Sequence, residues 1–187
     1  MRDNGLFYRS LAGVFGIFIL ASLWHFGYVW LPGKLSAILF PVNESPWEHV
    51  KIFFFPAIIV YAFIYFTKGK KYNNFFFGHS LALLITPAAM LGLFYLYRTL
   101  LGVNHYLPLD IAVCFISIFI GTMAAYHITK AKREFKLMNY LAIIIVLLMF
   151  TTYAILTYYP PHAPIFKDSI TQDYGIEGGN HEHEHNH

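Results

Sequence analysis

Charged residues are scarce in this chain of 187 residues. Asp, Glu, Lys and Arg make up 12% of the sequence, whereas soluble domains carry roughly 25%. Hydrophobic residues make up 57%, and the mean hydropathy is +0.51. So few charges cannot cover the water-facing surface of a domain of this size. We therefore expect the lipid bilayer to be the main partner of this chain.

Cysteine is also nearly absent, since Cys114 is the single thiol. One cysteine excludes a disulfide within the chain and a zinc site built from cysteines. Its neighbours are apolar, so we interpret Cys114 as a small buried hydrophobe rather than a reactive thiol. The formal net charge of +3 is too small for the basic surface that nucleic-acid binding requires, and we expect no nucleic-acid partner.

Five apolar stretches are long enough to cross about 30 Å of hydrocarbon as helices. Polar or proline-containing breaks separate them, so the sequence predicts an all-α, polytopic membrane bundle of five transmembrane helices. Residues 1–176 are predicted to form one domain. The expected spans are Leu11–Leu31, Val50–Thr67, His79–Leu101, Leu109–Thr129 and Met138–Tyr159.

Lysine and arginine predict the orientation of the bundle. Nine of the 13 basic residues fall on the side of the N-terminus, namely Arg2, Arg9, Lys68, Lys70, Lys71, Lys130, Lys132, Arg133 and Lys136. The other side carries only Lys34, Lys51, Arg98 and Lys167. Because basic loops stay cytoplasmic, we predict the N-terminus inside and the C-terminus outside. Most of the acidic residues and histidines then lie at the outer end.

The segment Asn43–His49, with sequence N-E-S-P-W-E-H, is the first candidate site at that end. Part of it is explained by helix capping, since Ser45 is a good N-cap and Glu48 lies three residues later. Capping requires neither Glu44 nor His49. Histidine and carboxylate ligands suit zinc or another divalent metal. The spacing leaves two interpretations open: a cap alone, or a cap combined with a metal or acid–base site.

His25 and Arg98 lie near the expected outer ends of the first and third spans. An ionisable group at membrane depth favours a functional role, but a histidine can also serve only as a hydrogen-bond partner between helices. Arg98 has two interpretations, because it can extend toward the interface or pair with Glu44, Glu48 or Asp110.

The residues after the fifth span predict a segment that folds back over the outer face. Prolines end the helix after Tyr159, and the following stretch to Ile176 contains apolar residues that a free tail would expose. His162 and Asp168 would then approach the residues around Glu44. Residues 177–187 follow as a flexible tail rich in His and Glu, which can capture metal ions weakly.

Two of these segments carry a resemblance. The stretch from Pro41 to Lys51 and the closing P-P-H-x-P-x-F and Y-G-I motifs resemble a family of small bacterial multi-pass membrane proteins with a domain of unknown function. The resemblance extends to about residue 176. It implies a helical protein of the bacterial plasma (inner) membrane and implies no activity.

These observations favour a metal or acid–base site at the outer face, with hydrolysis as one chemistry it would support. His25, Glu44, His49 and His162 are the predicted metal ligands, with zinc as the first candidate. Glu48 and Asp168 are the predicted catalytic carboxylates. Two other interpretations remain open: a small transporter or channel that uses His25 and Arg98, and a non-catalytic scaffold or accessory subunit that binds another membrane protein.

Overall fold

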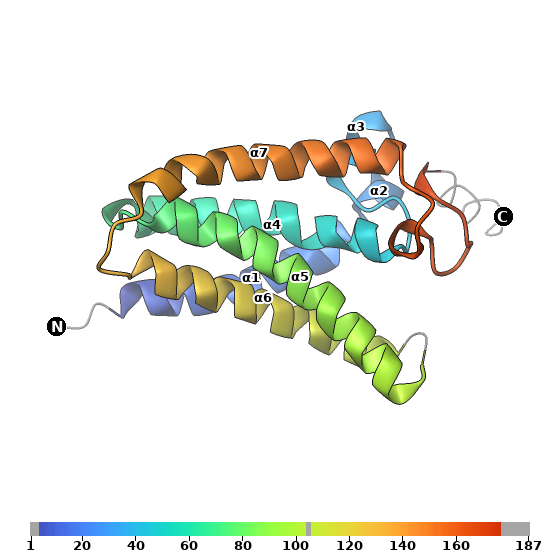
Figure 1. Ribbon diagram of the computed structural model, residues 1–187, viewed down its shortest axis with the longest axis horizontal. Helices are drawn as coiled ribbons and strands as arrows, with labels where there is room; N and C mark the ends of the chain where they lie inside the picture. Colours follow the sequence, from blue (N-terminus) through green and yellow to red (C-terminus); the bar gives the residue numbers. More distant parts are fainter. Residues whose placement is uncertain (1–3, 104–105, 177–187) are drawn as a thin grey trace. The chain divides into compact units, whose positions relative to one another are not determined.

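The computed structural model describes residues 4–103 and 106–176 (Figure 1). Helices account for nearly all regular structure in these ranges, which contain no named strand and one isolated β-bridge between Lys167 and Tyr174. The His/Glu-rich tail predicted for residues 177–187 lies outside the described residues.

Five helices are long and apolar enough to cross a membrane, as the sequence predicted. The chain is therefore an all-α, multi-pass membrane protein. The five helices are α1 (Gly5–Trp24), α4 (Pro46–Thr67), α5 (Phe75–Leu101), α6 (Leu107–Thr129) and α7 (Lys136–Tyr158). The short elements are α2 (Gly27–Trp30), α3 (Lys34–Leu39), η1 (Gly69–Lys71) and η2 (Pro164–Phe166).

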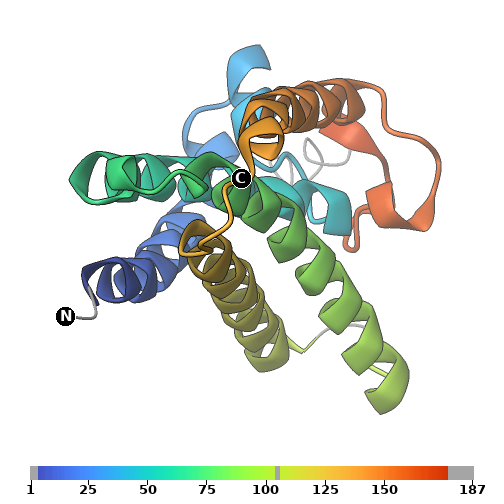
Figure 2. The ribbon, with the colours of Figure 1, turned by 60° about the vertical axis from the view of Figure 1, so that its left-hand side comes forward.

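The described chain separates into two compact units. Among the described residues, the first unit contains residues 4–19, 57–103 and 106–146, and the second contains residues 20–56 and 147–176. In the first unit, α5 and α6 run side by side (Figures 1 and 2). A glycine allows this approach, because a Cβ at Gly121 would lie 2.1 Å from Thr86 Oγ1. Cys114 is half-buried in α6.

Arg98, also in the first unit, lies over the ring of Phe94, with its guanidinium carbon 4.8 Å from the ring centroid. This contact is a cation–π interaction. The neighbouring Asp110 accepts a hydrogen bond from the hydroxyl of Tyr97.

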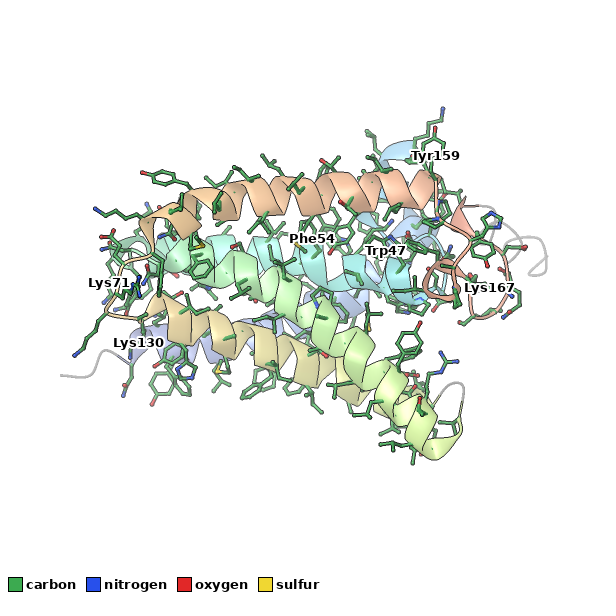
Figure 3. The ribbon with its side chains drawn as sticks, viewed as in Figure 1. Trp47, Phe54, Lys71, Lys130, Tyr159 and Lys167 are labelled. Atoms are coloured by element: carbon green, nitrogen blue, oxygen red, sulfur yellow. The ribbon has the colours of Figure 1, made fainter. Side chains whose placement is uncertain are left out.

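Aromatic contacts build the core of the second unit. Trp47 and Phe54 of α4 both pack on Tyr153 of α7, with ring centroids 5.5 and 4.9 Å apart (Figure 3). Trp47 also contacts Phe166 of η2 at 5.0 Å. The segment after α7 is therefore packed against α4 through Phe166.

The predicted first span, Leu11–Leu31, was wrong at its end, because α1 stops at Trp24. The indole nitrogen of Trp24 donates to the carbonyl of Leu39 at 2.8 Å. Three residues later, a Cβ at Gly27 would clash with the ring of Phe40. The chain thus turns at His25 and Phe26 because residues 39–40 pack against it. His25 follows the helix and does not lie within it.

Candidate metal centre

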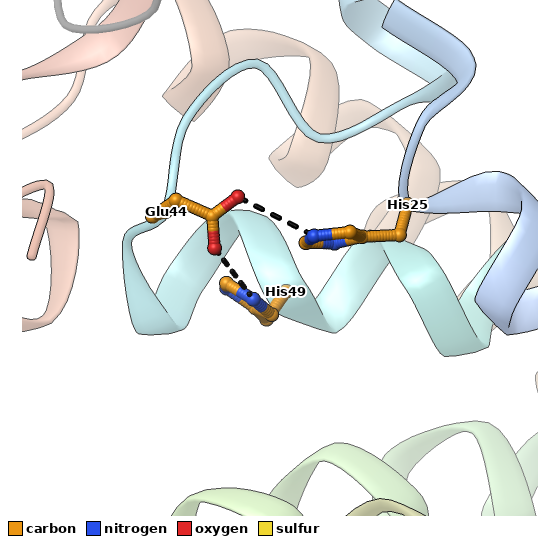
Figure 4. A group of neighbouring side chains, drawn as sticks. All are labelled: His25, Glu44 and His49. Carbon is orange, nitrogen blue, oxygen red and sulfur yellow. Dashed lines mark ion pairs between the residues drawn. The ribbon is translucent and has the colours of Figure 1, made fainter. Parts of the chain in front are cut away.

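Three of the predicted ligands come together in the second unit (Figure 4). His25 follows the last residue of α1, Glu44 lies in the loop before α4, and His49 lies in the first turn of α4. Each offers one ligand atom, and these atoms lie within 4.8 Å of one another. The group could therefore hold a metal ion.

The Glu44 carboxylate lies between the two imidazoles. Its Oε1 is 3.4 Å from Nε2 of His25, and its Oε2 is 3.3 Å from Nε2 of His49. The three side chains are about 30% exposed. The group is thus shielded from bulk water but remains reachable from it.

A backbone carbonyl sets the orientation of one ring. Nδ1 of His49 lies 2.9 Å from the carbonyl oxygen of Ser45. Because a carbonyl oxygen only accepts, Nδ1 carries the hydrogen in this contact. In neutral His49 the lone pair is then on Nε2, which faces the Glu44 carboxylate. Metal-bound histidines commonly have such a second contact on the other ring nitrogen.

The predicted N-cap was confirmed, and the predicted capping box only in part. The backbone N–H of Glu48 donates to Ser45 Oγ at 3.2 Å. The reciprocal contact is absent among the described residues, because the N–H of Ser45 donates to Asn43 Oδ1 at 2.9 Å and Glu48 Oε2 accepts from the N–H of Val42 at 3.0 Å. Glu48 therefore holds the loop that carries Glu44.

Glu48 also forms a buried ion pair with Lys51, a residue whose role sequence reasoning missed. Lys51 Nζ lies 2.6 Å from Glu48 Oε2, and the two residues are 0% and 2% exposed. The other oxygen of Glu48 accepts from the hydroxyl of Thr157 at 3.1 Å. The three-residue spacing of Glu48 and Lys51 on a helix was the signal for this pair.

Asp168 holds the returning segment against the Glu44 loop. Its Oδ2 accepts from the N–H of Glu44 at 3.0 Å, and its Oδ1 accepts from the N–H groups of Ile170 and Thr171 at 2.6 and 3.0 Å. Asn43 Nδ2 donates to the carbonyl of Gly175 at 2.8 Å. The two sequence motifs are therefore hydrogen-bonded to each other.

His162 is not part of the three-residue group. Its ring stacks on Tyr174, with centroids 4.5 Å apart and an interplanar angle of 12°. Together with Asp173, these two residues line an open cavity of about 530 Å³ beside the end of α7.

Burial lowers the pKa of His25 below its ordinary value of 6.5, an effect that nearby Glu44 opposes and His49 reinforces. The unfolded chain therefore takes up a proton at His25 at a higher pH than the folded chain does. As pH falls through 6.5, His25 should therefore contribute a loss of stability to the folded state. We expect the metal-free protein to lose more thermal stability between pH 7.5 and 5.5 than His25→Gln does, measured by unfolding in detergent. An equal loss in both proteins would contradict this.

The comparisons with known proteins identify a family but no activity. Residues 8–176 match the model of a family described as a family of unknown function (DUF6512), and the chain belongs to this family. No curated protein and no solved structure matches the chain.

Proposed function

We propose that this protein binds a divalent metal ion, with zinc as the preferred ion, through His25, Glu44 and His49. One observation carries the proposal: two imidazole Nε2 atoms face the same carboxylate, and His49 is held in this orientation by the carbonyl of Ser45. The site lies at the predicted outer end of the bundle, in what we infer to be the plasma membrane of a bacterium.

The distances fit a metal site as well as an ion pair. Charge-assisted hydrogen bonds between nitrogen and a carboxylate are about 2.7–2.9 Å long. Here the two separations are 3.4 and 3.3 Å. Ligands bound tetrahedrally at 2.0–2.1 Å from zinc lie roughly 3.3 Å from one another. Each imidazole Nε2 thus has nearly this spacing from one oxygen of Glu44, but from a different oxygen in each case. One ligand atom from each residue lies within 4.8 Å of the others, so binding zinc would draw the three ligands closer together.

The ligand set supports hydrolytic chemistry. Two histidines and one glutamate occur in catalytic zinc sites, where the fourth position holds a water whose pKa falls to about 7. The exposure of the three side chains leaves room for such a water or for a substrate. The catalytic roles predicted for Glu48 and Asp168 stay predictions, and both carboxylates also accept hydrogen bonds that fix the loop around Glu44.

Metal analysis of the purified protein tests the proposal. The four tail histidines should first be replaced by glutamine, because His181, His183, His185 and His187 can bind zinc independently. After dialysis against trace metal, we expect one zinc per chain. Glu44→Gln and His49→Ala should each reduce this to near zero, since metal sites need their full set of deprotonated ligands.

His162→Ala is the matched control, because His162 lies in the same unit and outside the three-residue group. It should retain one zinc per chain. Stoichiometric iron in place of zinc would assign the site to the two-histidine, one-carboxylate iron class. If no zinc, manganese or iron is retained, the proposal fails. The same holds if Glu44→Gln retains as much metal as the parent protein.

A further inference from the structure

The segment between α1 and α4 exposes apolar side chains although it crosses no membrane. It consists of α2, α3 and their connection, which we call the α2–α3 shelf (residues 27–39). Its most exposed apolar residues are Val29, Trp30, Leu31 and Leu35, at 54, 60, 61 and 78%. Three further residues of the shelf, Pro32, Gly33 and Lys34, are also exposed. Such a cluster of apolar side chains usually marks a binding surface.

Hydrogen bonds fix the backbone of the shelf at the ends of three long helices. Trp24, the last residue of α1, donates to the carbonyl of Leu39 at 2.8 Å. Lys51 of α4 donates to the carbonyls of Ala37 and Phe40 at 2.8 and 3.2 Å.

The third anchor comes from α7. The hydroxyl of Tyr158, its last residue, donates to the carbonyl of Lys34 at 2.5 Å. Figure 1 shows α3 beside this end of α7. The shelf is therefore held by helix termini and cannot extend away from them.

These anchors determine the depth of the shelf in the membrane. Each of the three helices is long and apolar enough to cross a bilayer, so their ends lie at its boundary. Lys51 lies five residues into α4, or about 7.5 Å along the helix axis. The shelf thus lies within a few ångströms of the boundary between hydrocarbon and headgroups. Tryptophan favours this layer, and a lysine there extends its ammonium toward the headgroups.

We propose that the α2–α3 shelf lies in the interfacial layer of the bilayer and that its exposed face binds membrane lipid. Interfacial elements bury an apolar face to a depth of about 5–10 Å, which matches the position that the anchors impose. In the sequence, the shelf follows two further exposed apolar residues, Leu23 of α1 and Phe26, which are 52 and 50% exposed. Lipid is therefore the simplest partner for this surface, because the bilayer already surrounds the protein and no second protein has to bind. This proposal is independent of the metal site.

Depth-dependent fluorescence quenching tests the proposal on the full chain. The protein has three tryptophans, Trp24, Trp30 and Trp47. Subtracting the emission of Trp30→Phe from that of the parent protein isolates Trp30. Both proteins are reconstituted in phosphatidylcholine vesicles with acyl chains brominated at carbons 6–7 or at carbons 11–12. We expect a larger fractional loss for the Trp30 component than for the residual emission, and more loss with the shallow bromines.

A second reporter keeps the test independent of position 30. Leu35→Trp in the Trp30→Phe background places an indole on α3, where the native residue is 78% exposed. It should show the same order of quenching. Quenching of both reporters by aqueous iodide and not by brominated lipid would overturn the proposal. Protection from both quenchers would also overturn it and would indicate a second copy of the chain or another protein on the shelf.

Discussion

Replacing Glu48 by glutamine is expected to lower the free energy of unfolding by about 3–5 kcal/mol, because it removes one partner of a buried ion pair. Glutamine has nearly the same shape but no charge. The ammonium of Lys51, which is 0% exposed, would then be buried without its counter-charge. The measurement is unfolding in detergent micelles, followed by circular dichroism.

Glu134→Gln is the control, since Glu134 and Lys136 are 3.7 Å apart and well exposed. It should change stability by less than about 1 kcal/mol. Similar small losses in the two variants would contradict the prediction.

A double variant separates the charge from the hydrogen bonds of Glu48. In Glu48→Gln with Lys51→Met, no unpaired charge remains in the buried site. Buried ion pairs can often be replaced by apolar residues at little cost. Lys51 also donates to the carbonyls of Ala37 and Phe40, so recovery should be incomplete. We expect the double variant to be more stable than Glu48→Gln alone. If it is less stable, the lost hydrogen bonds outweigh the unpaired charge.

The five spans could be predicted from sequence because each is an apolar run of membrane length. Their ends were less certain, and α1 shows why. Apolar residues continue from Phe26 to Leu31, and they outweighed the weak local stop signal of His25 and Gly27. The helix stops because residues 39–40 pack against Trp24 and Gly27. A tertiary contact of this kind cannot be read from a window of sequence.

The candidate ligands could be predicted in part, for a similar reason. His25, Glu44 and His49 all lie near the ends of predicted spans on one side of the membrane, which makes their meeting possible but does not determine it. His162 satisfied the same criterion and stacks on Tyr174 instead. All four residues are of types that bind metal ions, and all lie on the same predicted side of the membrane. Only the path of the chain after α7 separates His162 from the other three.

The sequence also could not distinguish a solvent-exposed carboxylate from buried carboxylates that accept hydrogen bonds from the backbone. Glu44 is 31% exposed, whereas Glu48 and Asp168 are each 2% exposed. The hydrogen-bond donors for Glu48 come from residues 42, 51 and 157, and those for Asp168 come from residues 44, 170 and 171. These sets combine segments that are more than 100 residues apart, so their convergence depends on the completed fold.

Asp168→Asn is expected to weaken zinc binding by about 10–100-fold, the range observed when a residue that orients a metal ligand is removed. The carboxylate accepts three backbone N–H groups, including that of Glu44. An asparagine side chain has one accepting oxygen and one NH₂ group, which only donates. At least one of the three backbone N–H groups would then face the NH₂ group and lose its acceptor. The loop carrying Glu44 should then move away from His25 and His49. Loss of a hydrogen bond to a charged group should also cost about 1.5–3 kcal/mol of stability.

Zinc competition titrations and unfolding in detergent, both without tail histidines, measure these two effects. Asp173→Asn is the matched control, because Asp173 is an exposed aspartate of the same segment, and it should leave both quantities near the parent values. Ser169→Ala removes only the hydroxyl that donates to the carbonyl of Glu44 at 3.1 Å, so a smaller loss of affinity is expected.

If Glu44→Gln abolishes zinc binding while Asp168→Asn retains the parent affinity, then Glu44 binds the metal without help from the returning segment. If Asp168→Asn loses both stability and affinity, the returning segment holds the Glu44 loop in the position that metal binding requires.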